Sequence, residues 1–311
     1  MQVTVIITVL NEAGTVADLL EGLRAQTRPP DEIVFVDGGS TDGTVAALEA
    51  TGAGLPLRVV VDPGAGISRG RNRSVRESAH DLLAVTDAGC RPFSGWLERL
   101  LAPLEDRSGT DLVCGSYRLI PRTDFEDCVG RCSGSARLRL QGQYVRPTAR
   151  SLAFTRAAWE KAGGFPEETH VLDDLGFVLS LVDCGGKLKT ASAAIVGWRP
   201  RSSYRAVLRQ FHLYARDTTR GGRTSRMYLW TLFQDVLLAG LLLWGLVMPG
   251  PLPWVLMVAA IGVYLFRKAR TGCFGVPGWK TLYRVPLILA IIHLGVLTGI
   301  ARGLFMRLYR L

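Results

Sequence analysis

Short runs of apolar, mostly β-branched residues alternate with amphipathic stretches through the first 200 residues. The runs at 3–9, 33–37, 57–61 and 82–86 have the length and composition of buried strands. The stretches between them carry apolar residues three and four positions apart, which is typical of helices that pack on a sheet. This alternation predicts an α/β domain with a mostly parallel, doubly wound sheet.

The same pattern predicts the other elements of this region. We expect helices from Asn11 and Glu12 to about Gln26, over 44–50, from near Ser68, and over 92–104, 157–162 and 172–182. Further strands are expected over 111–119, 151–155 and 191–198. Residues 121–150 are basic and lack a clear period, so they favour an acceptor-side loop, a helix near lipid headgroups or a plain surface helix.

The last third of the chain is strongly apolar. Apolar segments run over about 228–248, 252–266 and 285–301, and the first is long enough to span a bilayer. Asp235 and His293 lie inside them, where an ionisable group is costly unless it faces protein or water. Residues 203–220 form an amphipathic, arginine-rich stretch typical of an interfacial helix. We therefore expect a catalytic domain over 1–200, an interfacial helix or linker over 201–226, and a membrane region over 227–311.

Charge is divided in the same way. Residues 1–200 carry a net charge of −3 and residues 201–311 a net charge of +13. Basic residues beside apolar spans indicate an anionic membrane surface, and no nucleic-acid-binding motif is present, so nucleic acid is not an expected partner. The six cysteines form no CxxC pair, and we expect free thiols in a reducing compartment.

The distribution of basic residues also predicts orientation. The N-terminus enters a strand at once, with no signal peptide, so the catalytic domain is expected in the cytoplasm. Five Lys and Arg between the second and third apolar segments place that loop in the cytoplasm too, and residues 249–253 outside. Three full crossings would leave Arg302, Arg307 and Arg310 outside, so the third segment is alternatively re-entrant or interfacial, or the tail lies against headgroups.

Polar side chains follow the strands at one predicted edge of the sheet. Asn11 and Glu12 follow the first strand, Asp37 ends the second, and Asp87 follows the strand at 82–86. Ligands of open α/β sheets bind at this edge. Asp37 can accept hydrogen bonds from a base or a ribose, although an ordinary strand–turn–helix corner would have the same sequence.

Two further patterns carry candidate chemistry. Arg69, Arg71 and Arg73 follow a glycine-rich loop at a helix N-terminus, which suits a polyanion or, alternatively, a solvated helix face. Asp173 and Asp174 are adjacent in the first turn of a predicted helix. They can cap that helix, or one can act as a general base whose proton affinity is raised by the other.

The ordered set of motifs resembles the GT-A glycosyltransferases of family 2. The resemblance covers about residues 1–217 and rests on the motifs at 5–12, 36–44, 70–72, 86–89, 163–165, 173–174 and 209–210. It implies an inverting enzyme that uses a nucleotide-diphosphate sugar, with Asp174 as general base and Asp173 beside it. The residues that it implies for donor binding are Thr8, Asn11, Glu12, Asp37, Ser40, Asp42, Gly70, Arg71, Asn72, Arg209, Gln210 and Arg216.

The chain departs from the family pattern at two places. The family has an Asp-x-Asp that holds a divalent metal, Mg²⁺ or Mn²⁺, on the donor diphosphate; here Asp87 is present but Gly89 stands at the second acidic position. The family also has a Gln-x-x-Arg-Trp motif, for which this chain has Gln210 and Arg216 at an altered spacing and no Trp. We expect a weaker metal site with donor binding preserved.

Together these features predict a non-processive glycosyltransferase in the cell (inner) membrane. It is expected to be a multi-pass protein with a cytoplasmic catalytic domain that transfers a sugar to a lipid-like or envelope acceptor. Because Gly89 replaces the second metal acid, a non-catalytic nucleotide-sugar-binding scaffold is one alternative. Because Asp235 and His293 lie inside apolar segments, a transporter-like protein is another. Retention of Asp174, Asp37 and Arg71 favours the enzyme over the scaffold, and the small number of spans disfavours the transporter.

Overall fold

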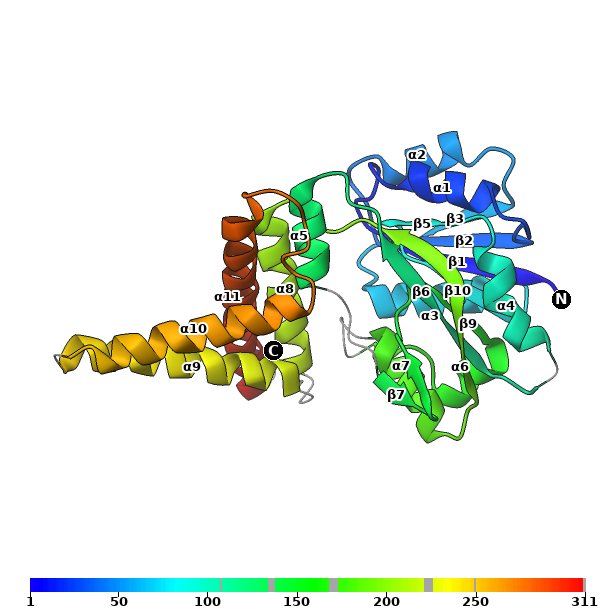
Figure 1. Cartoon of the computed structure of the whole chain (residues 1–311). Helices are drawn as coiled ribbons and strands as arrows, with labels where there is room; N and C mark the ends of the chain where they lie inside the picture. The colour runs from blue at the N-terminus through cyan, green and yellow to red at the C-terminus, as the bar shows by residue number, and fades with distance from the viewer. Residues whose placement is uncertain (107, 134–137, 168–172, 221–225, 249, 310–311) are drawn as a thin grey trace. The chain divides into compact units, whose positions relative to one another are not determined.

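The computed structural model describes residues 1–106, 108–133, 138–167, 173–220, 226–248 and 250–309. The chain forms two compact units (Figure 1). The first comprises Met1–Ile120 and Ser135–Arg199, and the second comprises Pro121–Gly134 and Pro200–Leu311. The segment 121–134 therefore belongs with the C-terminal unit, although the sequence alone groups it with the first 200 residues.

The first unit is built on a sheet that, in the described part of the chain, has eight strands in the order β3-β2-β1-β4-β9-β6-β10-β5. These are β1 (Val3–Val9), β2 (Glu32–Asp37), β3 (Leu57–Val61), β4 (Leu82–Val85), β5 (Cys90–Pro92), β6 (Leu112–Leu119), β9 (Leu152–Thr155) and β10 (Leu188–Trp198). β9 is antiparallel to both β4 and β6, and β5 is antiparallel to β10. The other pairs are parallel, which confirms the predicted mostly parallel sheet.

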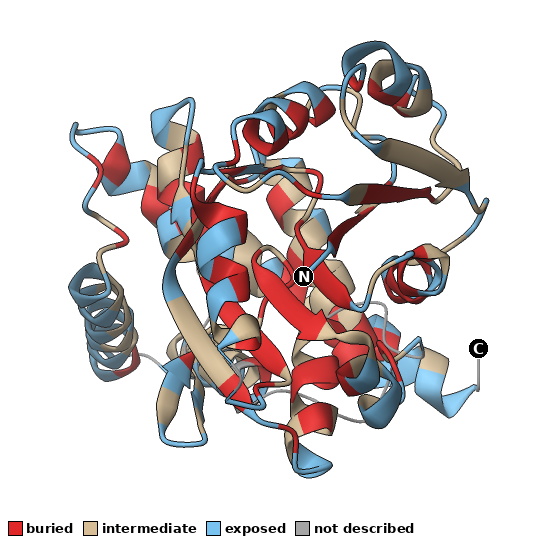
Figure 2. Ribbon diagram, turned by 90° about the vertical axis from the view of Figure 1, so that its right-hand side faces the viewer, coloured by how far each residue is buried: buried red, intermediate tan, exposed pale blue. Residues whose placement is uncertain are grey.

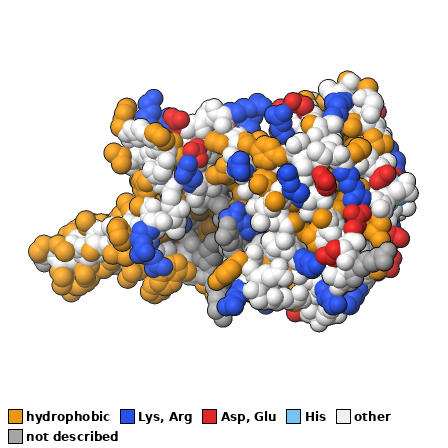
Figure 3. Space-filling view, turned by 45° about the vertical axis from the view of Figure 1, so that its right-hand side comes forward, with side chains coloured by type: hydrophobic (Ala, Val, Ile, Leu, Met, Phe, Trp, Pro, Cys, Tyr) orange, Lys and Arg blue, Asp and Glu red, His pale blue; other side chains and the backbone are white. Residues whose placement is uncertain are grey.

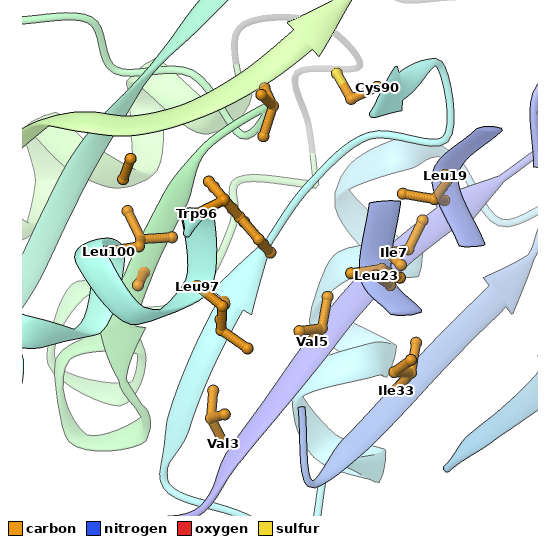
Figure 4. Close-up of a cluster of buried hydrophobic side chains, with 14 of the residues drawn as sticks. Val3, Val5, Ile7, Leu19, Leu23, Ile33, Cys90, Trp96, Leu97 and Leu100 are labelled. Atoms are coloured by element: carbon orange, nitrogen blue, oxygen red, sulfur yellow. The ribbon is translucent and has the colours of Figure 1, made fainter. Parts of the chain in front are cut away.

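Helices cover both faces of this sheet, as continuous apolar strands require. They are α1 (Val16–Arg24), α2 (Thr44–Thr51), α3 (Ile67–Glu77), α4 (Trp96–Glu105), α6 (Arg156–Ala162) and α7 (Asp173–Asp183). On one face, Leu19 and Leu23 of α1 and Trp96 of α4 pack with Ile7 and Val5 of β1 (Figure 4). On the other, Phe154 of β9 contacts Phe165 and Phe177 edge to face. Buried residues accordingly concentrate in the strands and on the inner helix faces (Figure 2).

Three local expectations are corrected. The helix predicted from residue 92 begins at Trp96, because residues 90–92 pair with the end of β10, with Trp198 opposite Cys90. The helix predicted from Asn11 begins at Val16, because Asn11 has a left-handed backbone (φ 56°). The unassigned stretch 121–150 contains helix α5 (Asp124–Cys132) and a hairpin of β7 (Leu138–Leu140) and β8 (Gln143–Val145).

The second unit is helical where the structure describes it. It contains α5, α8 (Tyr204–Arg220), α9 (Arg226–Val247), α10 (Leu252–Arg270) and α11 (Thr281–Leu308). By length and composition, Tyr228–Val247, Leu252–Arg270 and Thr281–Leu308 are each able to cross a membrane. The three predicted apolar segments are thus three helices, and their surroundings differ.

Helices α8 and α11 pack closely along one another. Gly295, Gly299 and Gly303 of α11 face α8 so tightly that a Cβ at any of them would collide with the α8 backbone. Small residues four apart allow two helix backbones to approach in this way. The apolar face of α8, including Val207, Phe211 and Ala215, is buried in the same cluster as α11. The face that the sequence assigns to an interface is therefore covered by protein.

Helices α9 and α10 pair as an arm that runs across the direction of α11 (Figure 1). The arm is covered with apolar side chains (Figure 3). At its base, Asp235 Oδ1 lies 2.7 Å from Nδ1 of His293, and Nε2 of His293 lies 2.9 Å from the Tyr264 hydroxyl. The two ionisable residues that the sequence places inside apolar segments are thus paired with each other.

Candidate active site

The carboxyl ends of β1 and β2 are joined by hydrogen bonds between their following loops. The Asn11 amide donates to Ser40 Oγ (2.8 Å), and the Thr41 amide donates to Asn11 Oδ1 (2.9 Å). The Glu12 amide donates to Thr44 Oγ1 (2.8 Å), and Asp42 Oδ2 accepts from the Ala13 amide (3.1 Å). The sequence-predicted residues Asn11, Glu12, Ser40 and Asp42 are therefore brought together at one edge of the sheet.

Asp37 is buried and its carboxylate is engaged within its own turn. Oδ2 accepts from the amides of Gly39 (3.0 Å) and Ser40 (2.9 Å), and Oδ1 accepts from Ser40 Oγ (2.5 Å). The side chain is 1% exposed. Asp37 thus fixes the loop after β2, and its role in binding the donor stays a prediction.

Helix α3 lies directly against β1 and carries Arg71. A Cβ at Gly70 would come within 2.8 Å of Thr8 Cγ2, so only glycine permits this approach without displacing Thr8. The predicted donor residues Thr8 and Gly70 therefore touch each other. Their contact places the next residue, Arg71, at the centre of the site.

The Arg71 guanidinium bridges two carboxylates from distant parts of the chain. Nη1 lies 2.5 Å from Asp173 Oδ2 and Nη2 lies 2.8 Å from Asp87 Oδ1, and Arg71 is 3% exposed. Burial alone would lower the pKa of Arg71. The negative charges of Asp173, Asp87 and Asp174 outweigh this effect, so the pKa lies above its ordinary value. Arg71 is a fixed cation that ties α3, the loop after β4 and α7 together.

Asp174 is held differently from Asp173. Its Oδ2 accepts from the Ala149 amide (3.0 Å), and its Oδ1 from the Leu175 amide (2.7 Å). Burial, reinforced by the negative charge of Asp173, raises the pKa of Asp174 to about 6, although Arg71 and the two amides oppose the shift. A carboxylate with this pKa is ionised at neutral pH and still basic enough to take a proton.

Asn72 has a positioning role that the sequence does not reveal. Its Oδ1 accepts from the Phe165 amide (2.8 Å) and from Trp159 Nε1 (3.0 Å). Its Nδ2 donates to the Phe165 carbonyl and to Glu167 Oε1, both at 2.8 Å. The amide group is used in fixing the turn at 163–165 to α3, and contact with the donor stays a prediction.

Asp87 is the candidate metal ligand. Among the described residues, no group of three or more His, Cys, Asp or Glu could enclose a metal ion. The Asp87 side chain is 33% exposed, and there is open space at Gly89, where a Cβ would meet nothing within 4 Å. Burial raises the pKa of the Cys90 thiol to about 12, with Asp87 adding to the shift and Arg150 opposing it. These residues fit a metal that takes one carboxylate and completes its shell with phosphate oxygens and water.

Arginines of the segment 146–150, for which the sequence left open an acceptor-side loop, a helix near lipid headgroups or a surface helix, also lie at this edge of the sheet. The guanidinium carbons of Arg146 and Arg150 lie 5.1 and 5.2 Å from the Tyr117 ring centroid, and that of Arg150 lies 4.2 Å from the Trp198 ring. Between them, the Ala149 amide binds Asp174. The only sequence signal for these residues was the recurrence of arginine in the stretch 121–150.

Three predicted donor residues lie in the second unit, on α8. Gln210 Nε2 donates to the Tyr214 hydroxyl (3.1 Å), and Arg216 Nε lies 2.5 Å from Asp217 Oδ1. Arg209 is on the same helix. Their role in donor binding stays a prediction.

A mostly parallel, helix-covered sheet with clustered carboxylates and an arginine at its carboxyl edge is the arrangement that the resemblance to the GT-A glycosyltransferases implies. Residues 4–152 match the glycosyl transferase family 2 profile. This match, over just under half of the chain, agrees with the resemblance to the GT-A glycosyltransferases of family 2 that the motifs show.

Curated relatives agree with this family. The chain is 35% identical over 118 residues to the glycosyltransferase AglE of Haloferax volcanii, over 37% of this chain and 38% of the relative. It is 25% identical over 214 residues to the pre-mycofactocin glycosyltransferase of Mycobacterium tuberculosis, over 65% of this chain and 44% of the relative. The chain thus spans less than half the length of these relatives.

Solved structures share the fold. The mannosyltransferase PcManGT of Pyrobaculum calidifontis, in complex with GDP-Man and Mn²⁺, has a TM-score of 0.55 and 17% identity, covering 99% of this chain and 87% of its own. Glucosyl-3-phosphoglycerate synthase of Mycobacterium tuberculosis, in complex with Mn²⁺, UDP-Glc and phosphoglyceric acid, has a TM-score of 0.50 and 20% identity, covering 70% of this chain and 77% of its own. At these identities the likeness concerns the fold.

Proposed function

We propose that the protein is an inverting glycosyltransferase that moves a sugar from a nucleotide-diphosphate sugar to a lipid-like acceptor at a membrane. The observation that carries the proposal is the position of Asp174, an ionised carboxylate with a raised pKa beside the ion pair of Asp173 with Arg71. A donor-binding scaffold has no need of a carboxylate with this proton affinity. The geometry therefore favours catalysis.

In the proposed reaction, Asp174 takes the proton of the acceptor hydroxyl as its oxygen attacks the anomeric carbon. The amides of Ala149 and Leu175 hold the carboxylate in place. Burial and the charge of Asp173 raise the pKa of Asp174, and the charge of Arg71 limits the rise. The bond from the anomeric carbon to the diphosphate breaks as the new bond forms, so configuration inverts and no enzyme-bound intermediate is required.

The donor would occupy the carboxyl ends of β1 to β4. The joined loops containing Asn11 and Ser40 form the nucleoside side of this edge, and Asp87 lies at its centre. Asp87 would hold a divalent ion, as the Mn²⁺ in the complexes with GDP-Man and UDP-Glc supports. When bound, such an ion supplies positive charge that stabilises the leaving diphosphate.

The membrane character of the acceptor is supported by the second unit. Residues 236–263, from the base of the α9–α10 arm to its tip and back, contain no charged side chain. The basic residues lie outside this stretch, so the cytoplasmic side of an inner membrane is the proposed site for the domain. A membrane-attached domain meets a lipid-like acceptor more readily than a soluble domain does.

Turnover measured against a panel of nucleotide sugars tests the proposal. Protein purified in detergent is mixed with each donor, Mn²⁺ and membrane lipid extract, and the lipids are analysed by mass spectrometry. A lipid heavier by one sugar, formed by wild type and lost in Asp174→Asn, supports the proposal. Donor binding without any transfer would favour a scaffold.

A further inference from the structure

The half of the sheet that the proposed donor leaves uncovered carries an unusual pair of arginines. Tyr117 and Trp198 lie near the carboxyl ends of β6 and β10, on the far side of β4 from β1 and β2. Their rings contact edge to face, with centroids 5.6 Å apart. Arg146 and Arg150 stack on these rings. Aromatic stacking fixes a guanidinium plane in position, and Nη1 of Arg150 also donates to Thr148 Oγ1 (3.2 Å).

Arg146 has no counter-charge among the residues that the structure describes. Its Nε is buried, and no described hydrogen bond or ion pair satisfies it. Buried polar groups are normally satisfied, and an unsatisfied cationic donor is costly. Val145 and Ala149, both fully buried, fix the segment on either side. Arg146 is therefore fixed by its stacking on Tyr117, while its Nε has no partner among the described residues.

We propose that Arg146 and Arg150 bind a phosphate group, and that this phosphate belongs to the acceptor. The guanidinium edge is suited to phosphate, to which it donates two parallel hydrogen bonds. The site lies beside the base, because Ala149, between the two arginines, donates its amide to Asp174. The identification of the phosphate with the acceptor depends on the proposed function.

Direct binding distinguishes a lipid phosphate from a soluble one. The protein, in detergent with a nucleoside diphosphate and Mn²⁺, is titrated by calorimetry with farnesyl phosphate, 3-phosphoglycerate and the neutral alcohol farnesol. We expect one of the two phosphates to bind at least tenfold more tightly than farnesol. Tight binding of farnesyl phosphate alone identifies a lipid acceptor, and tight binding of 3-phosphoglycerate alone a soluble one.

Variants tie the binding to the arginines. Arg146→Gln should weaken phosphate binding by about 10- to 100-fold, the loss expected for a charge-assisted hydrogen bond, and Arg146→Lys should weaken it less. Arg139→Gln, an exposed arginine on β7, is the matched control and should bind as wild type. Melting temperature and nucleotide affinity show that each variant is folded.

The inference is overturned if neither phosphate binds more tightly than farnesol, or if Arg139→Gln loses as much affinity as Arg146→Gln. Failure of the proposed function gives a different result. A protein that binds phosphate through Arg146 but never transfers sugar would contradict the transferase activity and leave the anion site in place.

A second inference concerns α11 and depends on a different observation. Helix α11 is flanked by polar helices for most of its length. It packs on α8, which carries Arg205, Arg209, Arg216 and Arg220, and near its start Arg284 pairs with Asp124 of α5 (3.6 Å). In its most apolar window 39% of residues are buried, against 0% for α9 and 6% for α10. Were α11 to cross the hydrocarbon core, several arginines of α8 would have to enter with it, at roughly 2.5–3.5 kcal/mol each.

The exposed face of α11 is an apolar stripe with basic residues at its end. Leu287, Leu294 and Phe305 are exposed on it, and Arg302 and Arg307 lie near its C-terminus. Such a stripe, opposite a covered face, is the pattern of a helix that lies in the plane of the lipid headgroups. The α9–α10 arm runs across this direction, as an inserted element attached to a surface helix would (Figure 1).

The geometry points to α11 lying along the membrane surface, with the α9–α10 arm as the inserted element. The partner is a bilayer containing anionic lipid, since the flanking residues are basic. Both ends of the arm then lie on one side of the membrane. Arg302 and Arg307 lie on the same side as Arg267 and Lys268. This removes the conflict with the positive-inside rule that three crossings create.

Depth measurements test this placement. Spin labels at Leu287, Leu294 and Phe305 in proteoliposomes with anionic lipid should report similar shallow depths. A helix that crosses would instead give depths that pass through a maximum. In sealed cells, a membrane-impermeant maleimide should leave Leu308→Cys unlabelled, like the exposed native Cys184, until the membrane is permeabilised. Labelling of Leu308→Cys from outside while Cys184 stays protected would overturn the inference.

Discussion

Arg71 and Asp173, 102 positions apart in the sequence, form an ion pair with Nη1 2.5 Å from Oδ2 and both side chains only 4% exposed. The pair joins α3 to α7 and leaves Asp174 as the carboxylate with the raised pKa. One acid of the adjacent pair is thus held in an ion pair, and the proposed role of general base is assigned to the other.

Replacing Asp174 by Asn tests its role as base. The change keeps the shape and one amide acceptor but removes the basic group, so the transfer rate should fall by about 10²–10⁴-fold with donor affinity retained. Because the raised pKa means that the charged form is disfavoured in the folded state, Asp174→Asn should not lower the melting temperature at pH 7.5. Asp183→Asn, at the exposed end of α7, is the control; near-normal transfer by Asp174→Asn would exclude it as the base.

The pH dependence of transfer should reflect the pKa of Asp174 near 6. Only the ionised carboxylate accepts a proton, so kcat/KM should fall about tenfold per pH unit below this value and level off above it. The stability effect has the opposite direction. Asp174 disfavours folding most when it is ionised in both states, above about pH 6, and has no effect below its unfolded value near 3.8. A flat rate profile between pH 5 and 7 would contradict the assignment.

The open space at Gly89 allows the family's second metal carboxylate to be introduced. A Cβ at this position meets nothing within 4 Å, so Gly89→Asp should be accommodated and should lower the Mn²⁺ concentration needed for half-maximal activity by about tenfold. Gly89→Ala occupies the space without a ligand and should leave the metal requirement unchanged. Full activity of wild type after EDTA treatment would show that Asp87 is not a metal ligand.

Removing Arg71 should damage the fold as well as the site. Arg71→Gln leaves Asp173 and Asp87 without their cation, and breaking such a buried pair costs about 3–5 kcal/mol of unfolding free energy. Arg73→Gln, two residues away in a largely exposed pair with Glu77, should cost less than about 1 kcal/mol. Denaturant unfolding of the two variants gives both values, and equal losses would contradict the importance of burial.

The contact of Asp235 with His293 should stabilise the second unit only while both partners are present. Asp235→Leu leaves His293 in apolar surroundings without its acceptor, so thermal unfolding in detergent should occur at a clearly lower temperature. The double variant Asp235→Leu/His293→Leu should recover much of the loss, because an apolar pair can replace a buried polar one. Gln234→Ala provides the control. An additive loss in the double variant would show that the two residues act independently.

The sequence by itself determined the helices and strands whose apolar and polar residues follow a clear short-range pattern. The strands at 3–9 and 57–61 agree with β1 and β3 residue for residue, because short runs rich in β-branched residues favour strands, both at the buried centre of the sheet (β1) and at its half-buried edge (β3). The same pattern located the three apolar helices, and the order of the motifs indicated the family whose profile residues 4–152 match. The adjacent acids at 173–174 were identified for the same reason, since they are neighbours in the chain.

Only the tertiary structure decided which of these groups meet. Pairing of Cys90 with Trp198 turned an expected helix start into β5, and contact with α11 covered the expected interfacial face of α8. The Asn72 amide and the Asp37 carboxylate make hydrogen bonds within the fold that the sequence does not reveal, and their contact with the donor stays a prediction. Such contacts join residues tens to hundreds of positions apart, and they depend on how whole elements pack. The periodicity of a sequence indicates whether a residue is buried. The residue that it contacts or hydrogen-bonds with is determined by how the complete chain packs.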